Sequence, residues 1–216
     1  MVRLWTRLKG IQMNEQQSEA WFLDRLGHAT ASNFSDVMAK GEGKTRKTYM
    51  MKLLAERLTG KPTESFSNKH TERGTEQEPF ARLAYEARTG NLVEEVGFIV
   101  HPDMKAGSSP DGLVDKDGGV EIKSVIPTVQ LETIAKGGFP STHKAQIQGA
   151  LFITGRAWWD FVSFSPDLPE NLRLYVFRVE RDQAYIDELE KEVIRFLADL
   201  YELEKKYRGL DLCSPQ

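Results

Sequence analysis

The period of the hydrophobic residues changes along this chain, and that change limits the folds open to it. Up to Gly90, apolar residues recur every three or four positions, which is typical of helices with one buried face. From Leu92 they follow the two-residue period of strands, and the helical period returns near Ser141 and from Ile186. Because helices and strands follow one another in this order, we expect a central mixed β-sheet flanked by helices, an α/β (α+β) fold.

The same patterns place the expected elements by residue number. They predict helices over 19–26, from about 34, and over 49–58, 80–87, 141–155 and 186–203. They predict strands over 92–100, around 113–114, and over 120–125, 158–164 and 172–179, with Asp117-Gly118 as a tight turn. Residues 40–47 read as a basic loop. No linker separates two domains, so we expect one domain over 1–216, with 1–12 as either an extended start or a short docking helix.

Composition excludes several classes of protein. The lone Cys213 cannot form an internal disulfide, and the four histidines lack metal-ligand spacing. No apolar run approaches the roughly 18 residues of a membrane span, and no secretory signal is recognisable. With 29 Lys and Arg against 32 Asp and Glu, the net charge is -3, so bulk charge does not bind nucleic acid. We therefore expect a cytoplasmic protein, without membrane contact, whose nucleic-acid contacts depend on a local basic lining.

Two carboxylates and an ammonium are expected to meet on neighbouring strands. Asp111 lies in the sequence Pro-Asp-Gly, and Glu121-Ile122-Lys123 begins ten residues after Asp111. Because side chains alternate along a strand, Glu121 and Lys123 share one face while Ile122 points to the core. Oxygen ligands from adjacent strands suit Mg²⁺, which keeps several waters for a phosphate to displace. The lysine could then orient or deprotonate a water, or offset charge in a phosphoryl transition state.

Similar short strings occur elsewhere in the chain. Pro102-Asp103 is the main alternative to Pro110-Asp111, and we prefer Asp111 because it precedes the strand that turns back into Glu121. The Glu-x-Lys string at 204–206 is expected on a helix, where a spacing of two does not share a face. From the pattern alone, a surface turn and an exposed ion pair remain an alternative.

Several ordered segments resemble a known family of nucleases. Ser109–Gly112 followed by Glu121–Lys123 resembles the PD-(D/E)xK signature. Three further stretches are similar to the phage lambda exonuclease family, the YqaJ-like viral recombinases: Trp21–Ser32, Arg73–Arg82 and Lys144–Gln148. Lys52–Glu56 and Gly137–Phe139 add weaker similarity. The resemblance covers residues 21 to about 180 and implies a restriction-endonuclease-like core.

The resemblance implies a role for each residue that matches the family's active site. Asp111, Glu121 and the backbone carbonyl of Ile122 would bind the catalytic Mg²⁺, for which Mn²⁺ could substitute, and Lys123 would be the catalytic lysine. Gln146 would be the active-site glutamine, and Gln148 is a weaker candidate for the same position. Without the resemblance, both glutamines read as part of a polar helix face.

Glu78 falls where the family has a helix carboxylate that helps to bind a second metal ion. Pro79 departs from a regular helix, since proline disfavours helical backbone at the residue before it. We therefore expect Glu78 near a helix start or a kink. The alternative is that Thr75–Glu78 forms a capping box.

Arg25 matches the family arginine that recognises the 5′-phosphate of a DNA end, and a planar guanidinium suits that contact. Ser32, with Thr30 as the lesser candidate, would add hydroxyl and helix N-terminal donors to the same anion. The alternatives are that Thr30 and Ser32 only cap a helix and that Arg25 is a solvated charge. Lys44 and its basic neighbours either follow the DNA backbone or are solvated.

The resemblance finally implies a reaction and its partners. The chain would be a Mg²⁺-dependent 5′-to-3′ exodeoxyribonuclease that digests one strand of duplex DNA from a 5′-phosphorylated end, releasing 5′-mononucleotides and leaving a 3′ overhang. Such enzymes form homotrimeric rings and serve phage or prophage recombination, in the bacterial cytoplasm, with a single-strand annealing protein. The alternatives are an endonuclease of the same superfamily, a non-catalytic DNA-end binding module and a phosphohydrolase of small nucleotides.

Overall fold

The computed structural model describes residues 14, 16, 18–39, 44–63 and 69–210, and its centre is a five-stranded sheet. The strands lie in the order β2 (Val93–Glu94), β5 (Gly112–Val114), β6 (Gly118–Ser124), β7 (Trp158–Phe164) and β8 (Leu174–Glu180). β6 and β7 are parallel, and the other neighbours are antiparallel. A parallel pair needs a crossover connection, which here contains α5 (Pro127–Lys136) and α6 (Lys144–Thr154). The expected mixed sheet is confirmed.

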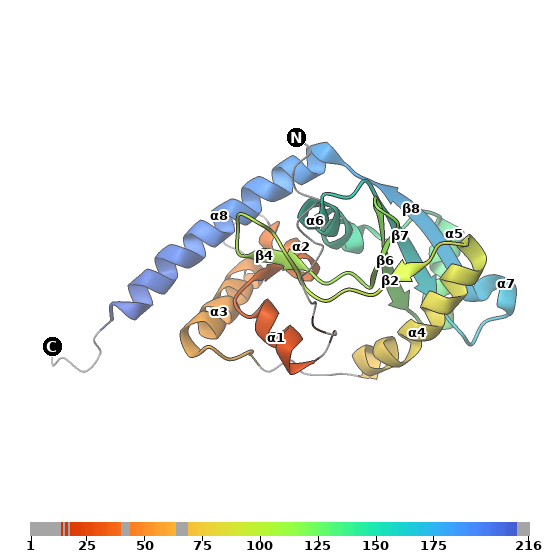
Figure 1. Cartoon of the computed structure of the whole chain (residues 1–216), viewed down its shortest axis with the longest axis horizontal. Coiled ribbons are helices and arrows are strands. Elements are labelled where there is room, and N and C mark those ends of the chain that lie inside the picture. The colour runs from red at the N-terminus through yellow and green to blue at the C-terminus, as the bar shows by residue number, and fades with distance from the viewer. Residues whose placement is uncertain (1–13, 15, 17, 40–43, 64–68, 211–216) are drawn as a thin grey trace.

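Helices cover both faces of this sheet (Figure 1). α6 packs on one face, where Trp159 and Phe161 are buried with Leu151. α4 (Lys69–Thr89) packs on the other face, where Tyr85 is buried with Val162. Residues of β7 thus alternate between two apolar clusters, as the two-residue period predicts.

A second, three-stranded sheet lies beside α6 (Figure 1). Its order is β1 (Ala29–Thr30), β4 (Ala106–Ser108) and β3 (Ile99–Val100), with β1 parallel to β4. At Gly107, an added Cβ would lie 2.3 Å from the Phe98 ring, so only glycine fits this close approach. This sheet brings the end of α1 (Glu19–Arg25) next to the segment that precedes Asp111.

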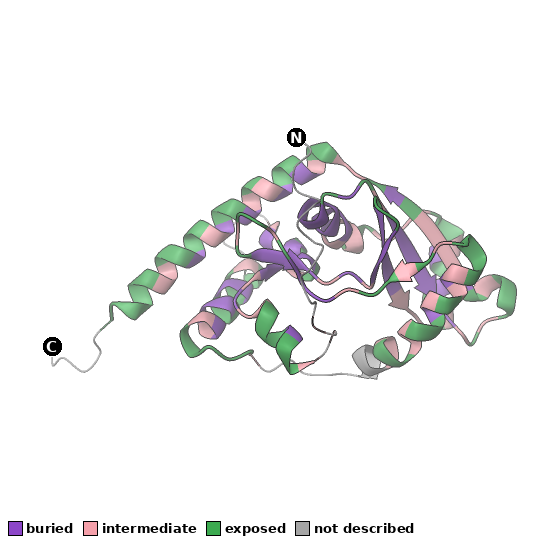
Figure 2. Ribbon diagram, in the orientation of Figure 1, coloured by how far each residue is buried: buried purple, intermediate pink, exposed green. Residues whose placement is uncertain are grey.

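The C-terminal helix α8 (Gln183–Arg208) packs along α3 (Lys44–Thr59) and α6. Its buried residues repeat at helical spacing, and its outer face is exposed (Figure 2). The members of the buried stripe are Ile186, Leu189, Val193, Phe196 and Leu200. The amphipathic helix expected over 186–203 is therefore confirmed. None of the described helices is long and apolar enough to cross a membrane.

Two expected segments differ in the structure. Residues 92–100 do not form one strand, because β2 and β3 belong to different sheets and the chain leaves the first sheet between them. Residues 44–47 form the first turn of α3 rather than a loop. Within that turn, Arg46 donates to Asp199 at 2.9 Å and lies over the Phe196 ring, so it is committed to α8. Residues 40–43 of the expected loop, the 1–12 segment and Cys213 lie outside the described residues.

Helix α4 departs furthest from expectation. It begins well before residue 80 and contains Pro79 in its interior. Phe80 and Leu83, which the sequence pattern places on the buried face, are 64% and 63% exposed. Ala81 and Tyr85 are the buried residues instead, because a small alanine lets the helix approach the sheet closely.

Some elements have no recognisable signal in the sequence. α5 buries Gln130 and Thr133 while Val129 and Leu131 are exposed, so its apolar residues do not mark its packed face. β4 consists of Ala, Gly and Ser. The pattern also misses the short α7 (Glu170–Arg173) before β8.

Candidate active site

The hairpin of β5 and β6 sets the two candidate carboxylates, Asp111 and Glu121, opposite each other. Gly112 pairs with Val120 across the hairpin, so Asp111 and Glu121 face each other at the next position. The Ile122 N–H donates to Asp111 Oδ2 at 2.5 Å, which fixes this carboxylate beside the middle of β6. Arg156 holds the turn, since its Nη1 donates to the carbonyl oxygens of residues 114, 115 and 118.

Glu121, Lys123 and Gln146 form one hydrogen-bonded group on the α6 side of the sheet. Lys123 Nζ lies 2.5 Å from Glu121 Oε1, and Gln146 Nε2 donates to the same oxygen at 2.6 Å. The Glu121 residue is only 2% exposed. Ile122 points the other way, into the cluster beneath α4, so the alternation expected along this strand is confirmed.

The charges in this group act strongly on one another. Burial and the neighbouring Glu121 raise the pKa of Asp111 well above its usual value. Burial alone would lower the pKa of Lys123, but the charges of Glu121 and Asp111 outweigh it and raise that pKa. His143 stacks on Phe161 near the same group, and burial and Lys123 lower its pKa. The site therefore combines crowded negative charge with one firmly held ammonium.

Glu78 approaches this group from α4. Burial raises the pKa of the Glu78 carboxyl, although the positive charge of Arg82 acts to lower it. The negative charges of Glu95 and Glu121 raise the pKa further. Its carboxylate accepts from Arg82 Nη2 at 3.0 Å, and Arg82 also pairs with Glu95. The capping-box alternative is wrong, because α4 begins at Lys69 and Thr75–Glu78 lies inside the helix. Glu78 is nowhere near the helix start, and it directly precedes the interior Pro79.

The donor atoms of this group suit a divalent cation. Asp111 and Glu121 supply carboxylate oxygens, and the backbone N–H of Ile122 bonds to the Asp111 carboxylate. Within the described ranges, no three His, Cys, Asp or Glu side chains form a complete metal-binding cluster. A hard cation that keeps water or substrate ligands needs no such cluster, and its charge would relieve the repulsion that raises the Asp111 pKa. The residues present therefore fit Mg²⁺ or Mn²⁺.

Arg25 lies at the end of α1 and is held beside the segment that leads into the β5–β6 hairpin. Its Nη1 donates to Ser109 Oγ at 2.8 Å, and Trp21 Nε1 donates to the same oxygen at 3.1 Å. The guanidinium carbon lies 4.2 Å from the centre of the Trp21 ring and 5.7 Å from that of Phe98. Burial lowers the pKa of Arg25, and the group remains charged because an arginine starts from a very high value. Arg25 is thus fixed rather than solvated.

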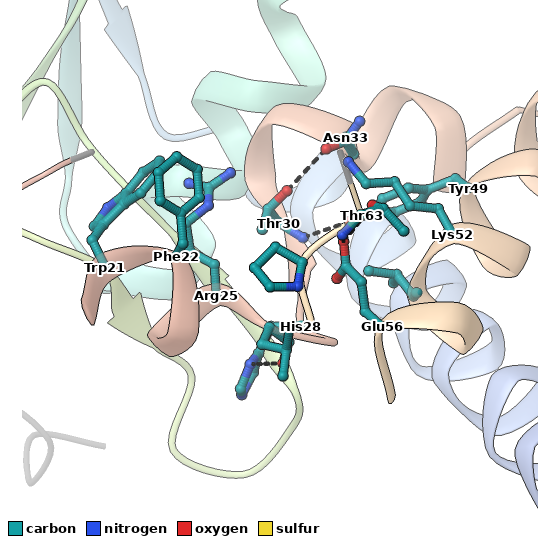
Figure 3. Close-up of a pocket in the computed structure, with 13 residues that line it drawn as sticks. Trp21, Phe22, Arg25, His28, Thr30, Asn33, Tyr49, Lys52, Glu56 and Thr63 are labelled. Carbon is teal, nitrogen blue, oxygen red and sulfur yellow. Dashed lines mark hydrogen bonds between the residues drawn. The ribbon is translucent and has the colours of Figure 1, made fainter. Parts of the chain in front are cut away.

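Arg25 also lines a cavity of about 190 Å³ between α1 and α3 (Figure 3). Thr30 lines the same cavity, whereas Ser32 does not, although their hydroxyl oxygens lie 3.2 Å apart. Thr30 occupies the N-cap position of the short 3-10 helix Ala31–Asn33 without a side-chain capping bond, and Ser32 lies inside that helix, so the N-cap alternative is wrong for Ser32. Thr30 therefore becomes the leading hydroxyl candidate next to Arg25.

The structure separates the remaining candidates. Gln148 donates to the Glu180 carbonyl at 2.9 Å and accepts from the Asp182 N–H at 2.9 Å, so it joins α6 to β8 and not to the carboxylates. Asp103 lies in an exposed turn where its N–H donates to His101. The sequence analysis gave no individual role to Ser109, which here accepts from both Arg25 and Trp21. Its place in the Ser109–Gly112 segment is the signal in the sequence that could have found it.

Comparison with known proteins gives consistent results. Residues 20–157 match the YqaJ-like viral recombinase domain model. The crystal structure of an alkaline exonuclease, LHK-Exo from Laribacter hongkongensis, is 42% identical, with a TM-score of 0.83 over 88% of this chain and 96% of its own. The LHK-Exo complex with dAMP gives 43% identity with the same score and coverage. A phage related exonuclease from Haemophilus somnus 129PT shares the fold, with 16% identity and a TM-score of 0.64 over 86% and 99% of the two chains. No curated protein sequence matches significantly.

Proposed function

The chain belongs to the YqaJ-like viral recombinase family, and from this premise we propose that it is a metal-dependent 5′-to-3′ exodeoxyribonuclease. Family and fold confirm the resemblance to the phage lambda exonuclease family and the restriction-endonuclease-like core. The enzyme would digest one strand of duplex DNA from a 5′-phosphorylated end and leave a 3′ overhang. The dAMP bound to LHK-Exo is a nucleoside monophosphate, which is the class of product that this reaction releases.

The hydrogen bond from Arg25 to Ser109 is the observation that carries this proposal. Ser109 stands two residues before Asp111, so a phosphate anchored at Arg25 would lie close to the catalytic carboxylates. A terminal phosphate held there places the adjoining phosphodiester, and not a distant one, at the site of cleavage. This arrangement favours an exonuclease over an endonuclease.

The side chains of the site have complementary roles in hydrolysis. A divalent cation held by Asp111, Glu121 and the Ile122 carbonyl would supply Lewis-acid activation of the phosphodiester. Lys123, held as an ammonium against Glu121, would donate to a phosphate oxygen and offset the charge of the transition state. Water attacks phosphorus and the bond to the 3′ oxygen breaks, so the released nucleotide ends in a 3′-hydroxyl and the attacked phosphate stays on the 5′ carbon of the shortened strand. Gln146 would orient Glu121 during this step.

We assign the metal as Mg²⁺, with Mn²⁺ as a substitute, and Glu78 as a ligand of a second ion. The ion pair between Glu78 and Arg82 would hold the carboxylate oriented for that role. We further propose that the enzyme forms a homotrimeric ring and supplies 3′ overhangs to a single-strand annealing protein of the same phage or prophage recombination system. Light scattering of the purified chain and co-purification with that protein test these two assignments.

Digestion of end-labelled DNA tests the activity itself. Linear duplex with a 5′-phosphate on one end only is incubated with Mg²⁺ or with EDTA, beside closed circular DNA. The proposal expects mononucleotides from the phosphorylated strand alone, only with Mg²⁺. Cutting of the circle would make the protein an endonuclease. DNA-end binding with no product at any Mg²⁺ or Mn²⁺ concentration would make it a binding module.

A further inference from the structure

The cavity beside Arg25 carries a second positive charge on its opposite wall. Lys52 projects from α3 into the lining, and Figure 3 shows it on the side of Asn33 and Tyr49, across from Arg25 and Trp21. In the part of the chain that the structure describes, the Lys52 ammonium has no hydrogen-bond or ion-pair partner. The Arg25 guanidinium uses one N–H on Ser109 and has further N–H groups available. Two cations thus line one space from opposite walls.

The rest of the lining contains one carboxylate and several neutral polar groups. Glu56 is the one carboxylate among the lining residues, and its charge acts on Arg25. Its two oxygens already accept from the Gly27 N–H at 3.1 Å and the Thr63 hydroxyl at 2.8 Å, so Glu56 is held in place. Thr30 and Asn33 line the space between the two cations, with the Thr30 hydroxyl 3.0 Å from Asn33 Oδ1. A volume of about 190 Å³ holds roughly six waters at liquid density, which is room for a phosphate group.

We propose that Lys52 is a second cationic contact to the 5′-terminal phosphate and that, with Arg25, it selects a terminal phosphate monoester over an internal phosphodiester. The inference rests on the proposed function and deepens it. A monoester carries a charge of about -1.5 to -2 at neutral pH, whereas an internal diester carries one negative charge. Two cations on opposite walls attract the more highly charged monoester more strongly than an internal diester.

The test compares binding of two duplexes, one with a 5′-phosphate and one with a 5′-hydroxyl, by fluorescence anisotropy in EDTA. Omitting metal keeps the readout independent of cleavage. Lys52→Gln is expected to lower the ratio of the two affinities about fivefold, the size of an accessible ion pair. Lys52→Arg should restore the ratio, and the effect should shrink as salt is raised. Lys136→Gln removes a charge from an exposed position on α5 and should leave the ratio at its wild-type value.

The outcomes separate this inference from the proposed function. A reduced ratio of the two affinities in both Arg25→Ala and Lys52→Gln supports joint recognition of the terminal phosphate by these two cations. A reduced ratio in Arg25→Ala, with a wild-type ratio in Lys52→Gln, overturns the role of Lys52 and leaves the exonuclease proposal standing. If Lys52→Gln weakens the binding of both duplexes equally, the role of Lys52 is also overturned. Lys52 would then contact DNA without distinguishing a 5′-phosphate from a 5′-hydroxyl. No preference for 5′-phosphate in the wild type overturns both.

Discussion

Arg25 Nη1 donates to Ser109 Oγ at 2.8 Å, and this bond joins the end of the first helix to the segment that carries Asp111. Ser109 also accepts from Trp21, so its own hydroxyl proton is left to donate elsewhere. The contact fixes the distance between the candidate phosphate anchor and the carboxylates. End recognition and catalysis are therefore expected to respond together when it is broken.

Ser109→Ala tests this coupling. Removing the acceptor leaves the Arg25 and Trp21 donors unpaired in a partly buried place, so stability should fall by about 1–3 kcal/mol. The preference for phosphorylated over hydroxyl 5′ ends should fall, though by less than in Arg25→Ala, because the charge remains. Competition between the two ends in one digestion measures this. A preference equal to the wild-type value would show that Arg25 needs no support from Ser109.

Lys123→Ala should nearly abolish cleavage. Loss of one donor to a developing phosphoryl charge costs about 10²- to 10³-fold in rate. Because the ammonium pairs with the buried Glu121, its loss should also destabilise the fold by about 1–3 kcal/mol without metal. Urea unfolding and single-turnover digestion measure the two effects. A variant that digests at the wild-type rate would show that the catalytic group lies elsewhere.

Asp111→Asn should stabilise the protein in EDTA while removing its activity. Since the folded-state pKa of Asp111 is raised, its ionised form costs stability at neutral pH, and the amide removes that cost. We expect the melting temperature in EDTA to rise by about 2–4 °C for each kcal/mol by which the substitution increases the free energy of unfolding. Added Mg²⁺ should raise the melting temperature of the wild type and not of the variant.

Asp103→Ala is the matched control for that experiment, because Asp103 also follows a proline but lies in an exposed turn. It should keep both the activity and the response of the melting temperature to Mg²⁺. Loss of the Mg²⁺ response in Asp103→Ala would move the metal site to that turn.

Gln146→Ala and Gln148→Ala should separate chemistry from structure on one helix. Gln146 donates to Glu121, so its loss should lower activity or metal affinity about 10- to 100-fold with little change in stability. Gln148 is buried and bonds to the backbone at both ends, so its loss should cost about 1–3 kcal/mol of stability and leave the rate of the folded enzyme unchanged. The two variants are compared by thermal melting and by their digestion rates below the melting temperature. The reverse pattern would exchange their roles.

The elements that the sequence predicted well are those whose period matches their burial. β7 and α8 follow this rule, because every second or every third to fourth residue meets a packed face. α4 and α5 break it, since each packs through small or polar residues such as Ala81 and Gln130 and leaves larger apolar residues exposed. A prediction from periodicity depends only on where the hydrophobic residues lie. It fails for helices whose packing depends on close approach of the backbone or on buried hydrogen bonds.

The sequence by itself determined which residues could carry chemistry. The two-residue period of β6 placed Glu121 and Lys123 on one face, and the ordered motifs pointed to Arg25, Asp111 and Gln146. Only the tertiary structure decided which of them meet. The pairing of Gly112 with Val120 set Asp111 against Glu121, and the small sheet carried Arg25 to Ser109. Contacts between residues distant in the chain depend on strand register and helix packing, which local patterns do not encode.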